Sequence, residues 1–252
     1  MIVARNLTKA YGDALVVRDV SLDIPRGGVT SIIGPNGAGK STLLSLLSRL
    51  LPATAGSVLV DELDVATAPS DVLARRLSIL RQDNHIAARL TVRDLVAFGR
   101  FPHSRGRPTE DDQRRIDDAI RYLGLEAFSD RFLDEMSGGQ RQRAFVAMVL
   151  CQDTDYVLMD EPLNNLDMRH AAGMMKLIRR IANEFNKAFV LVLHDINFAS
   201  IYSDHIVAMR EGALIRQGPP AEILQSDVLR EIFEIDIPVR EIDGQRLGLF
   251  YF

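Results

Sequence analysis

Residues 34–41 read Gly-Pro-Asn-Gly-Ala-Gly-Lys-Ser, and this segment constrains the fold more than any other part of the chain. It matches the pattern G-x-x-x-x-G-K-[ST] of a loop that wraps phosphate groups. Residues 29–33 before it form an apolar, β-branched run that predicts a buried parallel strand. Residues 41–47 after it predict a helix, whose positive N-terminal end favours an anion. The sequence therefore predicts a strand, a phosphate loop and a helix in succession.

Each residue type in this loop has a physical role. The glycines let the backbone turn tightly and bring its N–H groups against phosphate oxygens. Lys40 is expected to reach the β- and γ-phosphates, and the Ser41 hydroxyl is expected to bind Mg²⁺. The alternative is a glycine-rich turn with no ligand, which the Lys-Ser pair directly behind a strand disfavours. The predicted nucleotide-binding residues of the loop are Gly34, Pro35, Asn36, Gly37, Ala38, Gly39, Lys40, Ser41 and Thr42.

Composition sets broad limits on the protein class. A chain of 252 residues fits one large α/β domain with a sizeable core. The net charge of −4 gives no general attraction to nucleic acid. The single cysteine, Cys151, excludes an intrachain disulfide and suits a reducing cytoplasm. The five histidines show no metal-ligand spacing, which disfavours a structural zinc site.

Membrane-spanning segments are not predicted. No apolar run approaches the roughly 18 residues that cross a bilayer, and residues 1–6 lack the basic-then-apolar order of a secretion signal. Any membrane role is therefore expected to come through a partner.

Hydrophobic periodicity divides the chain into a strand-rich part, a helical part and an alternating part. In residues 85–151 the period is helical. Thr91 is expected to cap one helix, Thr109 introduces a second, and a third begins at Ser137. The predicted strands are 2–7, 16–24, 29–33, 57–60, 78–81, 156–159, 188–193, 205–209 and 213–217, and further helices are expected at 70–76, 168–185, 196–202 and 221–233. Alternating apolar strands and helices predict an α/β fold with a mainly parallel sheet, into which the helical part is inserted.

Two carboxylates end the predicted strand 156–159. In nucleotidases of this kind the first, Asp160, completes the Mg²⁺ shell, and the second, Glu161, orients and deprotonates the attacking water. An acidic turn at a strand end is the alternative, and the phosphate loop upstream weakens it.

Polar residues also follow two other predicted strands. The Gln82 side chain can meet Mg²⁺ or the water, and His194 can hydrogen-bond a γ-phosphate or hold the water. A lone Gln or His at a strand end is more often structural. A functional role for Gln82 and His194 is therefore inferred because the other nucleotide-binding motifs occur in the same chain. Tyr11 can stack on adenine, or it is a surface aromatic in a turn.

The segment Ser137-Gly138-Gly139-Gln140 places two glycines at a helix start, where backbone N–H groups can touch a γ-phosphate. The chain's own helix after the phosphate loop already holds the phosphates, so we expect a second copy to supply this contact. Helix capping by Ser137 is the structural alternative, and both can hold together.

Together these residues resemble the nucleotide-binding subunit of an ATP-binding cassette (ABC) transporter, and the resemblance covers essentially the whole chain. It implies a P-loop NTPase (RecA-like) core with an N-terminal antiparallel β-subdomain and an inserted α-helical subdomain. Residues 1–252 would form a single ABC ATPase domain, with 1–84 and 152–252 as the RecA-like and β core and 85–151 as the helical signature subdomain.

The resemblance also implies residue roles in ATP hydrolysis with Mg²⁺. Tyr11 corresponds to the adenine-stacking aromatic and Gln82 to the Q-loop glutamine, which also approaches the metal. Ser137, Gly138, Gly139 and Gln140 correspond to the signature motif, preceded by Met136 where the family usually has leucine; this swap conserves volume. The remaining assignments are Asp160 as the Walker B aspartate, Glu161 as the catalytic base, Asp167 in the D-loop across the dimer and His194 as the switch histidine.

Narrower features resemble the iron(III)-siderophore importer branch: residues 98–103, 161–168 and 194–200. Importers of cobalamin or haem use similar ATPases and remain alternatives, as does a lipid-linked cargo. A rival class is the DNA-repair or chromosome-associated ATPase with the same head. Such heads usually carry long coiled coils or zinc modules, which this sequence lacks; a translation-associated relative would need two cassettes in one chain.

The resemblance implies partners and a location. We expect a head-to-tail homodimer that sandwiches two ATP molecules, transmembrane permease subunits, a substrate-binding protein acting indirectly, and no nucleic acid. The helical part around Gln82 to Phe101 is expected to dock on the permease, and Arg89, Arg93 and residues 103–107 either face it or form a solvated basic surface. The expected location is the cytoplasmic face of the cell membrane.

Overall fold

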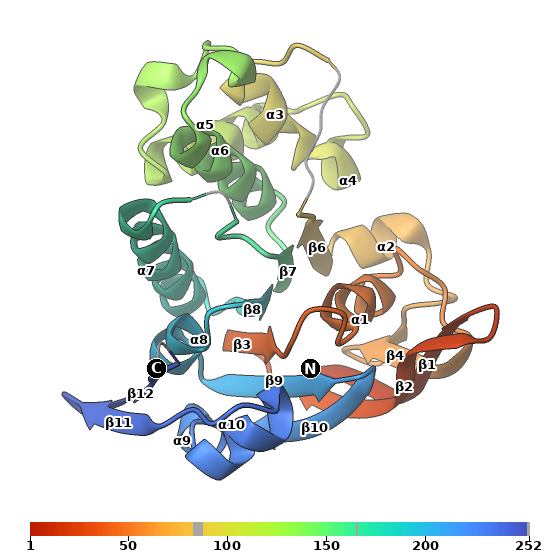
Figure 1. Ribbon diagram of the computed structural model, residues 1–252. Helices are drawn as coiled ribbons and strands as arrows, with labels where there is room; N and C mark the ends of the chain where they lie inside the picture. The colour runs from red at the N-terminus through yellow and green to blue at the C-terminus, as the bar shows by residue number, and fades with distance from the viewer. Residues whose placement is uncertain (83–87, 165, 251–252) are drawn as a thin grey trace.

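The phosphate loop follows a strand in the middle of a six-stranded sheet (Figure 1). The computed structural model describes residues 1–82, 88–164 and 166–250. The strand order is β10-β9-β3-β8-β7-β6; β9 to β6 are parallel, and β10 pairs antiparallel with β9 at the edge. The strands are β3 (Gly28–Ile33), β6 (Leu77–Leu80), β7 (Tyr156–Asp160), β8 (Ala188–Val192), β9 (His205–Arg210) and β10 (Ala213–Gly218).

Apolar residues on the two sides of this sheet belong to different cores. Ile32, Leu158 and Val190 pack with α1 (Lys40–Leu47). Phe189 and Leu191 belong to the other core, which holds buried residues of α7 (Met168–Glu184) and α8 (Ile196–Tyr202). Parallel strands covered on both faces need continuous apolar runs, and all five residues of β8 are buried. The predicted α/β class, with helices on both faces of a mainly parallel sheet, is confirmed.

A second, antiparallel sheet lies beside α1, with the order β2-β1-β4-β5. Ile2 of β1 pairs with Ile24 of β2 on one side and with Val60 of β4 on the other. All three side chains are fully buried in the same core as α1, which joins the two sheets. The predicted N-terminal antiparallel sheet is therefore present. Its strands are β1 (Ile2–Tyr11), β2 (Ala14–Ile24), β4 (Ala55–Val60) and β5 (Leu63–Asp64), and α2 (Ser70–Ala74) follows it.

The chain between β6 and β7 forms helices that Figure 1 shows above the sheets. Three begin with a capping box in which the side chains at N-cap and N3 bond each other's backbone N–H: Thr91 with Asp94, Thr109 with Asp112, and Ser137 with Gln140. The helices are α3 (Val92–Phe98), α4 (Phe101–Ser104), α5 (Glu110–Tyr122) and α6 (Gly138–Cys151), with 3₁₀ turns at Glu126–Phe128 and Leu133–Glu135. The expected boundary at 84/85 lies outside the described residues.

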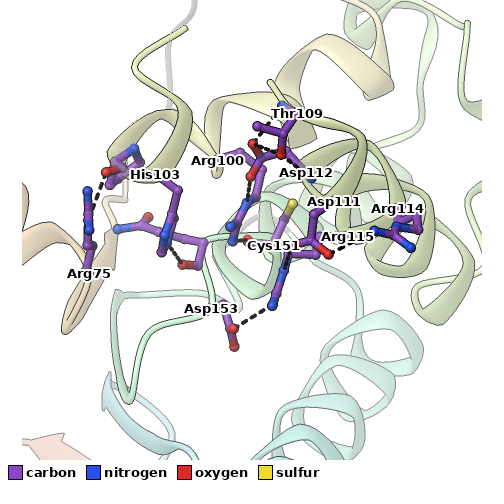
Figure 2. A network of polar contacts seen from close by, with 12 residues as sticks. Arg75, Arg100, His103, Thr109, Asp111, Asp112, Arg114, Arg115, Cys151 and Asp153 are labelled. Atoms are coloured by element: carbon purple, nitrogen blue, oxygen red, sulfur yellow. Dashed lines mark hydrogen bonds and ion pairs between the residues drawn. The ribbon is translucent and has the colours of Figure 1, made fainter. Parts of the chain in front are cut away.

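A buried ion pair holds this helical part together (Figure 2). Arg100, between α3 and α4, donates from Nε to Asp112 Oδ1 at 2.8 Å and from Nη1 to the Cys151 carbonyl at 2.9 Å. Both charged side chains are only 6% exposed. Asp112 also accepts from Thr109, so the same carboxylate caps α5 and neutralises Arg100. One ion pair thus fixes three helices, α4, α5 and α6, against each other.

Polar contacts also join the helical part to α2, the helix that precedes β6. Gln152, which follows α6, donates to the Ala74 carbonyl at 2.7 Å, and its own carbonyl lies 3.0 Å from His103 Nε2. Arg75 donates to the Pro102 carbonyl at 3.0 Å (Figure 2). These bonds cross between α2 and the helices α4 and α6.

Two features near the C-terminal end differ from the prediction. The helix expected over 221–233 is two helices, α9 (Pro220–Ile223) and α10 (Ser226–Phe233). They are separated because Gln225 is extended, and the two neighbours before it, Ile223 and Leu224, are both buried. A hairpin of β11 (Val239–Ile242) and β12 (Gln245–Gly248), which the sequence analysis did not predict, follows α10 and lies beside α8 (Figure 1).

Candidate functional site

The phosphate loop needs glycine at two positions for steric reasons. Gly34 and Gly39 have φ angles of 146° and 90°, which L side chains rarely adopt. A Cβ atom on Gly34 would lie 2.0 Å from the Met209 carbonyl oxygen, and one on Gly39 would lie 2.6 Å from that of Val16. The loop is therefore pressed between β9 and β2. Its tight path leads directly into the N-terminus of α1, an arrangement that binds anions.

Lys40 is folded back over the loop. Its ammonium group donates to the carbonyls of Gly34 and Pro35, each at 2.9 Å, and the residue is only 5% exposed. Burial lowers the pKa of Lys40, against the pull of the Glu161 and Asp160 carboxylates. These two hydrogen bonds hold the cation over the loop, where it would lie beside a phosphate group.

Asp160 ends β7 and lies against the first turn of α1. The Ser41 hydroxyl donates to Asp160 Oδ1 at 2.8 Å. Burial raises the pKa of Asp160, although the Ser41 hydrogen bond opposes the change. A hydroxyl and a carboxylate this close offer the oxygen donors that Mg²⁺ prefers, so these two residues fit a magnesium ion shared with a bound phosphate.

Glu161, which follows β7, contacts the polar residues that follow the two neighbouring strands, β6 and β8. Its carboxylate accepts from Gln82 Nε2 at 2.7 Å and lies 2.6 Å from His194 Nε2. The Glu161 backbone has a φ of 49°, in the left-handed region that costs a non-glycine residue about 1–3 kcal/mol. Because the strands β6, β7 and β8 are neighbours, their carboxyl ends bring these three side chains together.

The structure thus brings together most of the residues predicted from the sequence. Six of them lie at the carboxyl ends of β3, β6, β7 and β8: Lys40, Ser41, Gln82, Asp160, Glu161 and His194. Thr42 lies in the first turn of α1. Gln82 donates its side-chain hydrogen bond to Glu161 rather than to Ser41 or Asp160.

Ser137 to Gln140 lie in a different part of the molecule. Figure 1 shows α6 in the upper, helical part and α1 in the lower part. The Ser137 N–H donates to Gln140 Oε1 at 3.0 Å, and the Gln140 N–H donates to Ser137 Oγ at 3.4 Å, so these bonds stay within the helix start. A Cβ on Gly138 would meet nothing within 4 Å. This helix start is therefore open to an approaching group.

Asp167 caps α7 and lies close to the same helix start. Its Oδ1 accepts from the His170 N–H and lies 2.8 Å from His170 Nδ1. The backbone hydrogen bond from His170 lowers the pKa of Asp167. A Cβ on Gly139 would lie 2.8 Å from the His170 ring, so a larger residue there would require this ring to move. Asn165, the second asparagine of the 161–168 segment, lies outside the described residues.

Tyr11 lies at the tip of the β1–β2 hairpin, opposite Ala14, and is 51% exposed. Lys9 lies over its ring, 5.0 Å from the centroid. Val16, two residues after Ala14, contacts Gly39 through its carbonyl, so the hairpin passes directly beside the phosphate loop.

Glu161 and His194 also line a cavity of about 550 Å³. Apolar side chains line most of it, including Leu163, Leu166 and Phe198. Met168, at its edge, is 84% exposed. An apolar surface beside Glu161 and His194 is suited to being covered by another protein surface.

Sequence reasoning missed one feature of the site and one of the helical part. The left-handed backbone of Glu161 has no sequence signal, since glutamate carries no preference for it. The ion pair of Arg100 and Asp112 had a partial signal in the spacing Thr109-x-x-Asp112, which predicts a capping box but not a partner from another helix.

Comparison with known proteins agrees with this geometry. The family model described as "ABC transporter" matches residues 17–164, which include the phosphate loop, Gln82, the Ser137–Gln140 segment, Asp160 and Glu161. None of the helices in the described ranges is long and apolar enough to cross a membrane.

Individual relatives are similar over nearly the whole chain. The petrobactin import ATP-binding protein YclP of Bacillus subtilis is 51% identical over 251 residues, covering 100% of both chains. The ferric enterobactin transport ATP-binding protein FepC of Escherichia coli is 39% identical, covering 90% of this chain and 84% of that one. Among solved structures, the dimeric ATP-binding cassette MJ0796 bound to ADP and Pi is 28% identical, with a TM-score of 0.76 and coverage of 87% and 99%.

Proposed function

The chain belongs to the ABC transporter family, and from that membership we propose that it is the ATP-hydrolysing subunit of an iron(III)-siderophore importer. The observation that carries the proposal is the contact of Glu161 with both Gln82 and His194, beside the pair Ser41 and Asp160. Such a cluster at the mouth of a phosphate loop has the parts that ATP hydrolysis needs.

Residues at the strand ends would divide the chemistry. Lys40 and the loop N–H groups would hold the β- and γ-phosphates, and Ser41 and Asp160 would hold Mg²⁺, which neutralises charge on the phosphates when bound. Glu161 would take a proton from the attacking water, with His194 and Gln82 fixing its carboxylate. Gln82 would approach the metal only after leaving Glu161. Tyr11, exposed beside the loop, would stack on the adenine.

We propose further that two copies complete each nucleotide site. The helix start at Ser137–Gln140 is open to an approaching group and lies in a different part of the molecule from its own phosphate loop, so a second copy would present it to the γ-phosphate. Asp167 and the apolar cavity beside Glu161 would lie at the same contact between copies. The dimeric MJ0796 cassette supports this arrangement as a relative of known assembly.

The proposed cargo is an iron(III) complex of a siderophore. YclP and FepC carry petrobactin and ferric enterobactin in their names, and both match this chain nearly end to end. An ATP-hydrolysing subunit of this kind does not contact the cargo, so its residues do not select among cargoes. Cobalamin and haem importers are therefore the alternatives to be tested. A DNA-associated ATPase is the alternative from a different class.

A permease would hold the subunit at the cytoplasmic face of the membrane, and a substrate-binding protein would act indirectly through it. Phe98 and Phe101, 52% and 58% exposed, flank the short connection from α3 to α4 and offer apolar contacts to it. Arg89 instead pairs with Asp134 and Glu135, and Arg93 with Asp117, so these arginines are not free charges. In this proposal residues 1–252 form one ATPase domain, with 85–151 as its helical signature part.

Uptake by reconstituted vesicles tests the proposal. The subunit would be assembled with its permease and binding protein, and ATP-dependent entry of ⁵⁵Fe-siderophore measured, with cyanocobalamin and haemin as competing cargoes. Iron entry that requires ATP and is lost in Lys40→Ala supports the proposal. Entry of cobalamin or haem instead would replace the cargo, and DNA-stimulated hydrolysis without any transport would replace the class.

A further inference from the structure

The segment 194–200 carries polar side chains that the site described above does not use. Asn197 and Ser200 lie on α8, which begins directly after His194. The hydrogen bonds of these two side chains do not go to the residues predicted to bind the nucleotide. Both instead bind the backbone of β12, the second strand of the β11–β12 hairpin, which Figure 1 shows beside α8.

The side-chain amide of Asn197 makes two hydrogen bonds with the backbone of one hairpin residue, Gly248. The Gly248 N–H donates to Asn197 Oδ1 at 2.8 Å, and Asn197 Nδ2 donates to the Gly248 carbonyl at 3.2 Å. Ser200 Oγ donates to the Arg246 carbonyl at 2.6 Å. Three hydrogen bonds therefore tie two successive turns of α8 to alternate residues of one strand.

Close packing reinforces this attachment. A Cβ on Gly248 would lie 2.6 Å from Ile196 Cδ1 and 3.0 Å from Ile237 Cγ2, so a larger residue there would require these two isoleucines to shift. Ile196 and Ile237 are 4% and 3% exposed. The hairpin thus rests on the first turn of α8, the turn nearest His194.

The backbone of that first turn connects the hairpin to His194. Asp195 caps α8, and its Oδ1 accepts from the Asn197 N–H at 2.7 Å and from the Phe198 N–H at 3.2 Å. Asn197 is therefore bonded to Asp195 through its backbone and to Gly248 through its side chain. On the other side of His194, the Leu193 N–H donates to the Ile32 carbonyl at 3.1 Å. The imidazole itself is 48% exposed, so these flanking anchors, more than its own packing, decide where it lies.

We propose that Asn197 is a positioning residue for His194: by holding Gly248 it fixes the first turn of α8 and, with it, the contact between His194 Nε2 and Glu161 Oε1. This proposal rests on the proposed function, because it assigns His194 a part in ATP hydrolysis. Displacements of about 1 Å in a reacting group can cost about 100-fold in rate. Residues 239–248 are in this view part of the hydrolytic apparatus, although they touch none of the reacting atoms.

The experiment compares two anchors of the same hairpin. Asn197→Ala removes the anchor on α8, and Ser226→Ala removes a matched one on α10, where the Val239 N–H donates to Ser226 Oγ at 3.1 Å. We expect Asn197→Ala to lower the kcat of ATP hydrolysis by about tenfold or more with little change in KM, while Ser226→Ala stays near the parental rate. In a His194→Ala background Asn197→Ala should lower kcat no further.

A second measurement is independent of catalysis. In histidine-labelled full-length protein, the imidazole resonances of His194, assigned through His194→Ala, should shift or broaden in Asn197→Ala and stay in place in Ser226→Ala. If Asn197→Ala does not fold, Ser200→Ala, which loses a single bond one turn further along, takes its place in both measurements.

The outcomes separate the two claims. Equal losses of kcat in Asn197→Ala and Ser226→Ala, a full further loss in the His194→Ala background, or an unmoved His194 resonance would overturn the positioning role. A parental protein that hydrolyses no ATP, with or without its permease, would overturn the proposed function, and the resonance comparison would still test whether Asn197 positions His194.

Discussion

His194 Nε2 and Glu161 Oε1 lie 2.6 Å apart, although the two residues follow different strands and are separated by 33 positions in the chain. The contact exists because β7 and β8 are neighbours in the sheet and end at the same edge. Glu161 is thereby held between His194 and Gln82. A carboxylate with fixed partners is prepared to orient a water molecule, and this preorganisation is the basis of the first prediction.

Glu161→Gln should lower ATP turnover by about 10²-fold or more, because the amide cannot accept the proton from water. ATP binding should persist, since the phosphate loop is untouched, and size-exclusion chromatography with Mg-ATP should show a trapped dimer. Glu62→Gln is the matched control, because Glu62 also has a left-handed backbone, with φ 70°, but lies on the turn between β4 and β5. Turnover at the parental rate in Glu161→Gln would show that Glu161 is not the base.

Lys40→Ala should weaken nucleotide binding strongly, because it removes the cation that the loop holds against its own carbonyls. Titration with a fluorescent ATP analogue measures the change. Lys176→Ala, at an exposed position of α7, should bind the analogue like the parental protein. Equal affinity in Lys40→Ala and Lys176→Ala would contradict the assignment of the phosphate loop.

Gly34→Ala should destabilise the protein more than Gly37→Ala. Both glycines have positive φ angles, of 146° and 79°, so each alanine is strained by about 1–2 kcal/mol. Only at Gly34 does the new methyl group also collide with backbone, 2.0 Å from the Met209 carbonyl, while the space around Gly37 is open. Thermal unfolding should therefore give a lower Tm for Gly34→Ala, and equal Tm values would argue against the close contact of the loop with β9.

The buried pair of Arg100 and Asp112 should make stability depend on pH in acid. Burial by itself would raise the pKa of Asp112, but hydrogen bonds from the Thr109 backbone and from Arg100 outweigh it and lower the pKa to about 2. A carboxylate with a depressed folded-state pKa stabilises the protein above its unfolded pKa near 4. That contribution, about 2 kcal/mol, is lost as pH falls from about 4 to 2.

Urea unfolding between pH 7 and pH 3 measures about half of this loss. Asp112→Asn should unfold more easily at pH 7, by about 3–5 kcal/mol, because it leaves the Arg100 guanidinium buried without a counter-charge. Its stability should also fall less between pH 5 and pH 3 than that of the parental protein. Asp118→Asn is the control, because the Asp118 pair with Arg121 is solvent-exposed. An identical acid dependence in parental protein and Asp112→Asn would contradict the inferred coupling.

Much of the local structure follows from short stretches of sequence. The turn into α1 was predictable because Lys-Ser after spaced glycines leaves few other conformations, and the starts of α3, α5 and α6 were predictable from their capping residues. The continuous apolar run of β8 predicted a strand that is buried on both faces of the sheet. Residues near the C-terminal end were harder to predict, because β11 is largely exposed and both β11 and β12 are only four residues long, with little apolar alternation.

The sequence by itself determined most of the elements, the phosphate loop and the identity of the residues that end the central strands, because these depend on neighbours within a few positions. Only the tertiary structure decided that Gln82 and His194 both reach Glu161, that Asp160 meets Ser41, and that Gly248 fits against Ile196. Such contacts depend on strand order and on close packing between segments far apart in the chain, and neither periodicity nor propensity encodes which strand lies next to which.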